Sequence, residues 1–247
     1  MLDDPIKIGR YQQGASMKEI RVLAIAATFA IGALNAQGNP VPGQGTWETT
    51  LLGRDVHGQA LPASHANAVF LYDTSLNITW LKNANLNGPM TWIDAKSWAS
   101  LLQVGEFSSW RLARTLIPDA SCTEANAYPA VFSQGYGVGC IGSEMGHLFN
   151  STLGNAPNVA VSNAGNFQRL ENYYYWSETP TADNPYYVWT YNTSINGQGY
   201  TGTGTNGEFA MAVRDGDVLQ VPEPHTYVLF AIGLGILGLV RRRQLLG

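Results

Sequence analysis

Residues 68–102 decide the fold, and they read AVFLYDTSLNITWLKNANLNGPMTWIDAKSWASLL. The first half of this stretch predicts a β-hairpin, because the apolar runs 68–72 and 77–81 are separated by the turn-forming residues Asp73, Thr74 and Ser75. The second half changes to the spacing of a helix.

Thr91 begins the clearest helix of the chain. Its hydroxyl is the predicted N-cap, and Asp94 three positions later completes a capping box. One face of this helix is apolar and consists of Trp92, Ala95, Ala99 and Leu102, with Trp98 beside them. We expect the helix to end near Gly105.

The chain returns to strand patterns further on. A second short helix is expected at residues 143–153, with Gly154 as its left-handed stop. Asn196-Gly197 is typical of a hairpin turn. Three strands are expected after Phe167, at residues 173–177, 186–191 and 208–214. Helices first and an antiparallel sheet later predict an α+β domain.

The length and composition of the chain exclude several classes of protein. The chain has 247 residues, enough for one substantial domain or two small ones. Charged residues make up 13%, against about 25% in usual soluble domains, and 11% are aromatic, which excludes a disordered chain. The net charge of −4 comes from scattered carboxylates. Since nucleic-acid binders need a cationic face for the phosphates, no nucleic-acid partner is expected.

Residues 17–36 have the order of a secretory signal peptide. Lys18 and Arg21 precede thirteen uncharged residues, and Ala36 is the small residue expected at the cleavage site. The partners implied are the Sec translocon and signal peptidase, while a buried core helix is the alternative. Residues 1–16 contain two aspartates and do not resemble the head of a signal peptide, so we expect translation to start at Met17.

The C-terminal region carries a second apolar stretch. Residues 227–240 are uncharged and are followed at once by Arg241, Arg242 and Arg243. We expect a short transmembrane helix whose arginines stay cytoplasmic. Its three glycines spell G-x-G-x-x-G, but a dinucleotide site would need an acidic residue about 20 positions later, so they are interpreted as a close-packing helix face.

Val221, Pro222, Glu223 and Pro224 stand directly before this helix. The order V-P-E-P, apolar helix and arginine cluster resembles the PEP-CTERM sorting signal of Gram-negative bacteria. The resemblance implies recognition by an exosortase at the inner membrane, removal of the helix, and transfer to the cell surface or an exopolysaccharide matrix. The two prolines hold the motif extended, which suits access by a protease.

Cys122 and Cys140 are the only cysteines of the chain. In an oxidising compartment the pair predicts a disulfide worth about 3 kcal/mol. Two free thiols, or a copper-binding or catalytic pair, are the alternatives. No clustered His accompanies them, which argues against structural zinc, and no metal or cofactor is expected. Residues 37–220 hold 7 Lys and Arg and 14 Asp and Glu, a net charge of −7.

Six short motifs occur in order between residues 65 and 217: YDTSLNITWLKNAN, TWIDAKSWASLL, WRLA, SEMGHLF, YYYWSET and FAMAVRDGDV. Together they resemble the bacterial family of the Lcl C-terminal domain. The resemblance implies a C-type-lectin-like fold related to the formylglycine-generating enzymes. Ala113 departs from the pattern, because the family usually has Pro there. Residues 37–64 are expected to be a lead-in segment.

Several residues that could carry chemistry are expected to have structural roles. Arg111 is expected to form an ion pair with Asp94 or Glu144. His147 is a tempting general base, but the sequence offers no nucleophile elbow and no acid partner at helical spacing, so a structural role is favoured. Residues 215–217, Asp-Gly-Asp, are more typical of a turn than of a calcium site. Core packing is favoured for Trp80, Trp92, Trp98, Trp110 and Trp176.

The most credible ligand surface lies between residues 183 and 200. Alternation along a strand places Tyr187 and Trp189 on one face, and one row should be buried and the other partly exposed. Exposed aromatic rings beside amides suit carbohydrate, whereas an ordinary tyrosine-rich strand is the alternative. The candidate ligand-binding residues are Asn184, Tyr186, Tyr187, Trp189 and Asn192.

These observations predict an exported, non-catalytic envelope protein that binds carbohydrate or a matrix polymer. Two alternatives remain open. One is an oxidase of the formylglycine-generating type, in which Cys122 and Cys140 hold copper. The other is a purely structural matrix component without a discrete ligand.

Overall fold

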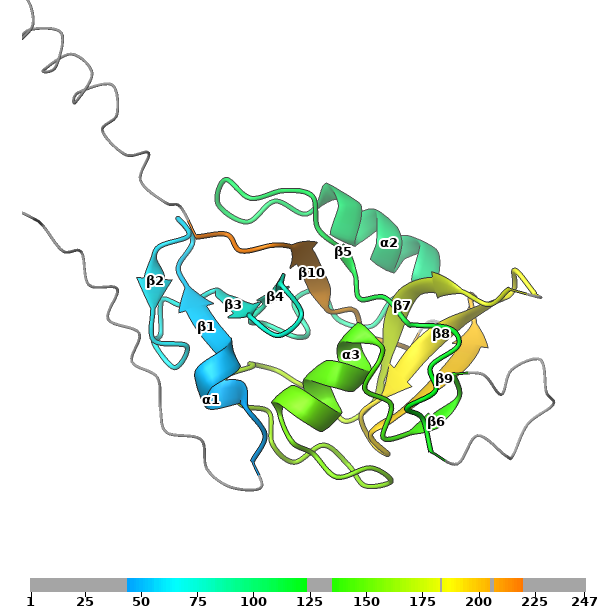
Figure 1. Ribbon diagram of the computed structural model, residues 1–247. Helices are drawn as coiled ribbons and strands as arrows, with labels where there is room; N and C mark the ends of the chain where they lie inside the picture. The colour runs from blue at the N-terminus through cyan, green and yellow to red at the C-terminus, as the bar shows by residue number, and fades with distance from the viewer. Residues whose placement is uncertain (1–43, 124–134, 183, 205–206, 220–247) are drawn as a thin grey trace, which may run out of the picture. The chain divides into compact units, whose positions relative to one another are not determined.

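A computed structural model describes residues 44–123, 135–182, 184–204 and 207–219 (Figure 1). All of them belong to one compact unit, Leu34–Gly247. The expected signal peptide at 17–36, with Ala36, and the extension at 1–16 lie outside the described residues. Among the described residues, no helix has the length and apolarity needed to cross a bilayer.

The first layer is a six-stranded antiparallel sheet with the strand order β2-β1-β3-β4-β10-β5. Its strands are β1 (Leu51–Arg54), β2 (Ala60–Leu61), β3 (Phe70–Asp73), β4 (Ile78–Leu81), β5 (Arg111–Leu112) and β10 (Ala212–Asp215). The predicted hairpin is confirmed as β3 and β4, whose pairing runs from Phe70 opposite Leu81 to Asp73 opposite Ile78.

The expected lead-in segment, residues 37–64, differs from the structure. It contributes a one-turn helix, α1 (Trp47–Thr50), and the strands β1 and β2 to the domain. β1 pairs along its whole length with β3. The strand lacked a sequence signal because its four residues include Gly53 and the buried Arg54, which interrupt an apolar alternation.

The second layer is a four-stranded antiparallel sheet in the order β6-β9-β8-β7. Its strands are β6 (Gly137–Val138), β7 (Tyr174–Pro180), β8 (Tyr187–Asn192) and β9 (Gly197–Gly202). The turn at Asn196-Gly197 is confirmed, and Asn196 has a φ of 48° there. β9 was not expected as a strand, because its sequence GQGYTG is half glycine.

The expected strand 208–214 is only partly correct. Its regular part is β10 (Ala212–Asp215), which lies between β4 and β5 in the first sheet and does not join β7 or β8. Glu208 and Phe209 form isolated bridges to Met90 and Tyr175 instead. The chain therefore crosses from one sheet to the other within a few residues, which a local pattern does not reveal.

The two expected helices are present with changed details. α2 (Trp92–Leu101) is capped by Thr91, whose side chain accepts the Asp94 amide as predicted, but it ends four residues before Gly105. The second begins as α3 (Glu144–Gly146) and continues as a π-helix, η2 (His147–Thr152). Gly154, with a φ of 65°, confirms the left-handed stop. The helices and sheets make an α+β fold.

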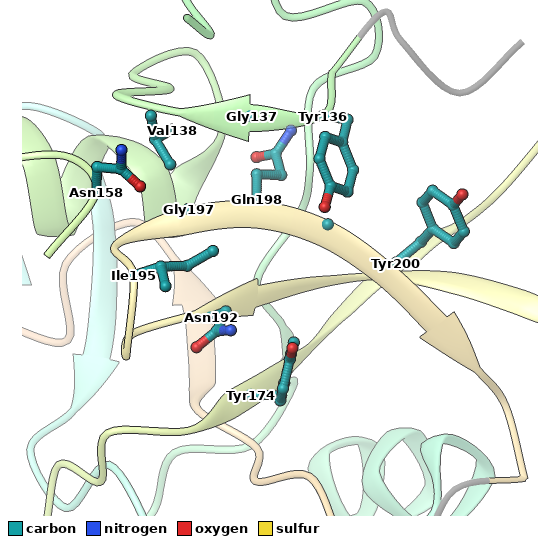
Figure 2. A pocket seen from close by; sticks show the side chains of 11 residues that line it. Tyr136, Gly137, Val138, Asn158, Tyr174, Asn192, Ile195, Gly197, Gln198 and Tyr200 are labelled. Carbon is teal, nitrogen blue, oxygen red and sulfur yellow. The ribbon is translucent and has the colours of Figure 1, made fainter. Parts of the chain in front are cut away.

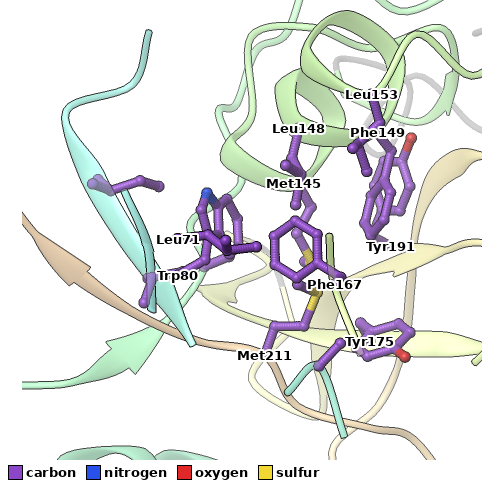
Figure 3. Close-up of a cluster of buried hydrophobic side chains, with 14 of the residues drawn as sticks. Leu71, Trp80, Met145, Leu148, Phe149, Leu153, Phe167, Tyr175, Tyr191 and Met211 are labelled. Atoms are coloured by element: carbon purple, nitrogen blue, oxygen red, sulfur yellow. The ribbon is translucent and has the colours of Figure 1, made fainter. Parts of the chain in front are cut away.

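The main core lies between the two sheets and the α3–η2 segment (Figure 3). Trp80 of β4 meets Phe167 edge to face, with ring centroids 6.3 Å apart. Phe149 of η2 stacks on Tyr191 of β8 at 5.1 Å. The core interpretation holds for the fully buried tryptophans, while the helix residues Trp92 and Trp98 are only partly buried. Of the five tryptophans expected in the core, Trp80, Trp110 and Trp176 are buried.

Candidate functional site

A groove of about 450 Å³ opens on the four-stranded sheet (Figure 2). β6, β7, β8 and β9 all contribute to it, together with the β8–β9 turn. It is lined by tyrosine rings, uncharged amides, two aliphatic side chains and glycine backbone. These residues are Tyr136, Gly137, Val138, Asn158, Tyr174, Asn192, Ile195, Gly197, Gln198, Gly199 and Tyr200.

The glycines of β9 let other groups approach the strand closely. A Cβ on Gly197 would lie 2.9 Å from Cγ1 of Val138, which is too close. A Cβ on Gly199 would lie 3.4 Å from the ring of Tyr136. A glycine inside a strand often marks such a close approach, so the low β-propensity of β9 has a local reason.

Aromatic rings gather around Tyr200, at one part of the groove. The ring centroid of Tyr200 lies 6.0 Å from that of Tyr136, 5.7 Å from that of Tyr187 and 6.0 Å from that of Trp189. These contacts are edge-to-face, a preferred geometry of aromatic pairs. Tyr174 of β7 lines another part of the groove, with 37% of its surface exposed.

Two amide side chains of the groove differ in their accessibility, because the oxygen Oε1 of Gln198 is buried. Oδ1 of Asn192 accepts the amide of Ser194 at 2.9 Å, and Nδ2 has no hydrogen-bond partner among the described residues. Nε2 of Gln198 donates to the carbonyl of Gly135, whereas Oε1 has no partner in the described part of the chain. Gln198 is 3% exposed, and an unpaired acceptor at that depth is uncommon in proteins.

Of the five residues expected to bind ligand, only Asn192 lines the groove. Trp189 is buried, while Tyr187 is exposed with its ring against Tyr200. Asn184 accepts the amide of Tyr186, whose side chain is 75% exposed outside the groove. Tyr187 and Trp189 contact the same ring, as alternation predicts, but β8 is buried on both faces from Val188 onward.

Sequence reasoning missed Tyr136, Asn158 and Tyr174, whereas Gln198 lies within the expected ligand region 183–200. β6 has two residues and pairs with β9 across about sixty positions, so no local pattern places Tyr136 beside Gly199. Tyr174 belongs to the expected strand 173–177, and its alternation with buried Tyr175 is the signal that could have identified it.

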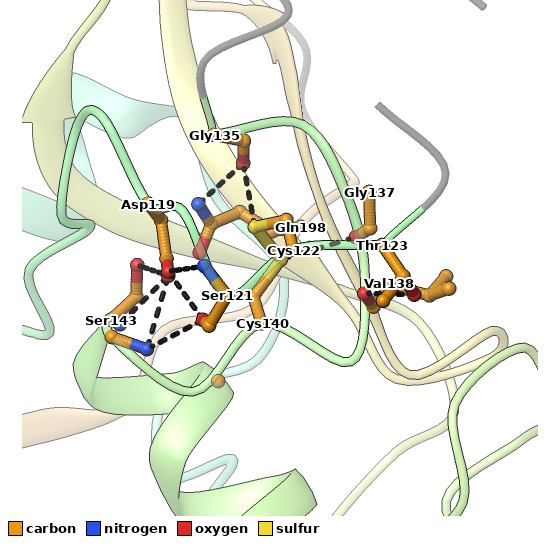
Figure 4. The surroundings of a disulfide bond; sticks show 12 residues. Asp119, Ser121, Cys122, Thr123, Gly135, Gly137, Val138, Cys140, Ser143 and Gln198 are labelled. Carbon is orange, nitrogen blue, oxygen red and sulfur yellow. Dashed lines mark hydrogen bonds between the residues drawn. A yellow bond between two sulfur atoms is a disulfide. The ribbon is translucent and has the colours of Figure 1, made fainter. Parts of the chain in front are cut away.

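Cys122 and Cys140 form the expected disulfide (Figure 4). Beside it, the buried carboxylate of Asp119 accepts the backbone amides of Ser121, Gly142 and Ser143, each at 3.1 Å. Cys140 follows β6 by two residues, so the bond fixes the strand that carries one wall of the groove. Both sulfurs are joined to each other, which leaves no thiolate for a metal in this state.

Tyr191 supports the β8–β9 turn from below the groove. Its hydroxyl accepts from Asn150 at 2.9 Å and donates to Oδ1 of Asn196 at 2.7 Å. Asn196 in turn donates to Asn150 Oδ1 and to two backbone carbonyls. Burial raises the pKa of Tyr191 well above its usual range, since a phenolate would be poorly solvated there.

His147 meets a serine that the sequence did not suggest. Its Nε2 lies 3.1 Å from Oγ of Ser75, and its Nδ1 lies 3.3 Å from the carbonyl of Ile141. The Ser75 hydroxyl also donates to Asp73, whose Oδ1 accepts the amides of Ser75 and Leu76 as well. Asp73 therefore occupies the amides of Ser75 and Leu76, and the structural role of His147 stays a prediction.

Arg111 pairs with Glu144, one of its two expected partners, and not with Asp94. Two of its nitrogens each lie 2.7 Å from an oxygen of Glu144, and it also contacts Asp215. Burial alone would lower the pKa of Arg111, but hydrogen bonds to both carboxylates raise it. Asp217 pairs with Arg54 at 2.7 Å, so both carboxylates of residues 215–217 are in ion pairs, and Gly216 between them has a left-handed φ of 75°.

The comparisons with known proteins concern the C-terminal region. The PEP-CTERM protein-sorting motif matches residues 220–244. No curated protein matches the chain, and no solved structure matches it either. The matched range includes Val221, Pro222, Glu223, Pro224 and the arginines 241–243, which lie outside the described residues, as does the expected helix 227–240. The chain thus carries a PEP-CTERM sorting tail, which indicates exosortase-dependent sorting to the bacterial cell envelope.

Proposed function

We propose that this protein is a non-catalytic binding module of the cell surface, and that the groove on the four-stranded sheet holds a carbohydrate or matrix polymer. The observation that carries the proposal is the lining of the groove, in which tyrosine rings stand beside the amide of Asn192, whose Nδ2 has no hydrogen-bond partner among the described residues. Sugar rings present C–H faces that stack on aromatic rings and hydroxyls that pair with amides.

The sorting tail supports a location of this module in the cell envelope. Delivery by exosortase would bring the groove to the cell surface or into the exopolysaccharide matrix, where polymers of this class are abundant. The route that we propose begins with the Sec translocon and signal peptidase acting on residues 17–36. It continues through an inner-membrane intermediate, held by residues 227–240, in a Gram-negative bacterium.

The resemblance of residues 65–217 to the Lcl C-terminal family belongs to the same proposal. Its support is the six motifs in order, and it would make the fold C-type-lectin-like. Oxidase chemistry on copper would require thiolates at Cys122 and Cys140, and these sulfurs are joined in a disulfide.

Substitution of Tyr174 tests the groove directly. In the full chain, Tyr174→Ala should weaken binding to a soluble polysaccharide by about threefold to tenfold, because one stacking surface is lost. Isothermal titration against the polymer that the unmodified chain binds best would measure this change. The circular dichroism spectrum should stay unchanged, because Tyr174 is 37% exposed and its removal opens no core cavity.

Tyr186→Ala is the matched control. It removes the same ring from an even more exposed position that does not line the groove. Equal losses in both variants would contradict the groove as the binding site. A chain that binds no polysaccharide, while sorting proceeds, would favour the structural role instead.

A further inference from the structure

No charged group lines the groove among the residues that the structure describes, and this limits what can occupy it. Among the described residues that line it, every side chain is aromatic, aliphatic or an uncharged amide. Recognition of a carboxylate or phosphate in proteins relies on Arg, Lys or a cluster of backbone amides. The three backbone amides that converge on one carboxylate near the disulfide are already used by Asp119.

The net charge of the surrounding domain also disfavours an anionic ligand. Residues 37–220 carry 7 basic and 14 acidic side chains. The arginines 54, 111 and 114 are each engaged by a carboxylate at 3.0 Å or less. A polyanion would approach a domain of net negative charge with few free cations, and the long-range field would slow its association.

The open amide position of Asn192 fits a hydroxyl group. Asn192 presents a donor at Nδ2, while its Oδ1 is used by the amide of Ser194. A sugar hydroxyl can accept from this donor and still donate to another group, so it needs no cation in the groove.

We infer that the ligand of this groove is a neutral polysaccharide, selected against uronic-acid and phosphate-bearing polymers by the uncharged lining. The inference rests on the proposed function and narrows its substrate class. Binding then depends on stacking and neutral hydrogen bonds, which salt screens little, and not on ion pairing.

The test compares two soluble probes of similar chain length, a neutral glucan and a polyuronate, with the full chain at low and high ionic strength. The glucan should bind with an affinity that changes by less than about twofold with salt. The polyuronate should bind at least about tenfold more weakly at low salt. Tighter, salt-sensitive binding of the polyuronate would overturn the inference. If Tyr174→Ala still weakened that binding, the groove would remain the binding site.

Binding of neither probe would overturn both the inference and the proposed function. Asn192→Asp adds an isosteric check, because the remaining oxygen can still accept the Ser194 amide while the donor is replaced by a negative charge. This variant should weaken glucan binding several-fold. Asn184→Asp is its control, since Asn184 accepts the Tyr186 amide in the same way outside the groove, and it should leave the affinity unchanged.

Discussion

Arg111 joins segments that are far apart in the sequence. From β5 it reaches Glu144 at the start of α3 and Asp215 at the end of β10. Its side chain is 10% exposed, and that of Glu144 is 17% exposed. Removing one partner of a largely buried pair leaves the other charge poorly solvated, which costs more than the pair itself contributes.

Arg111→Met should therefore lower the free energy of unfolding by about 1–3 kcal/mol. Chemical denaturation would measure the change. Arg114→Met is the matched control, because the Arg114–Glu178 pair is 55% and 32% exposed and exposed pairs contribute about 0–1 kcal/mol. Equal effects of the two substitutions would contradict this account.

The same contact makes the free energy of unfolding depend on pH in the acidic range. The hydrogen bond from Arg111 lowers the pKa of Asp215 below its ordinary value of 3.8. The carboxylate therefore stabilises the folded state above that value, and this contribution is lost as the pH falls through the lowered pKa. Asp215 is 68% exposed, so solvent screening keeps the contribution small.

At the scale of elements, the sequence predicts what local pattern encodes. The β3–β4 hairpin, the Thr91 cap and the Gly154 stop depend on neighbours within a few residues, and the structure has all three. β9 and the sheet membership of β10 depend on distant partners. Glycine in GQGYTG argues against a strand until Tyr136 and Val138 are seen beside it.

The residues of the groove also divide into those that a local pattern predicts and those that depend on distant pairing. Asn192 was identified because it belongs to a strand rich in aromatic residues and amides. Gln198 and Tyr136 meet only because β6 pairs with β9, and β6 is held near Cys140 by a disulfide that spans eighteen positions. No pattern within either short segment indicates that pairing.

The buried tyrosines of β7 and β8 predict an alkaline limit of stability. Burial raises the pKa of Tyr175 to about 12, although the hydrogen bond that its hydroxyl accepts from the backbone amide of Glu171 lowers it. Burial also raises the pKa of Tyr191. The folded state therefore holds both protons more tightly than the unfolded chain, whose tyrosines titrate near 10. Stability is complete below about pH 10 and declines as the pH rises toward 12.

Denaturation at a series of alkaline pH values, with tyrosinate absorbance followed in parallel, would measure this decline. Tyr175→Phe should make it shallower, because one of the two linked protons is removed. Tyr191→Phe is less suitable, since it also removes the hydroxyl that accepts from Asn150 and donates to Asn196. A free energy of unfolding that stays constant above pH 10 would contradict the prediction.

At the scale of the whole molecule, the sorting tail follows the folded part closely. Val218 is 2% exposed and packs in the cluster of Phe70, Phe107 and Trp110. The matched sorting motif begins two positions later, at residue 220. Arg54 pairs with Asp217, one position before Val218, so these two contacts of the folded part precede the motif in the sequence.

Deletion of residues 221–247 should therefore separate folding from sorting. The truncated chain should keep the thermal midpoint of the domain, because Val218 and the Arg54–Asp217 pair remain, and it should leave the cell surface for a soluble fraction outside the cytoplasm. Cell fractionation and a melting curve of the purified product measure the two effects, with Glu223→Ala in the full chain as a variant that keeps the apolar segment. Unaltered retention of the truncated chain at the surface would contradict the sorting role of the tail.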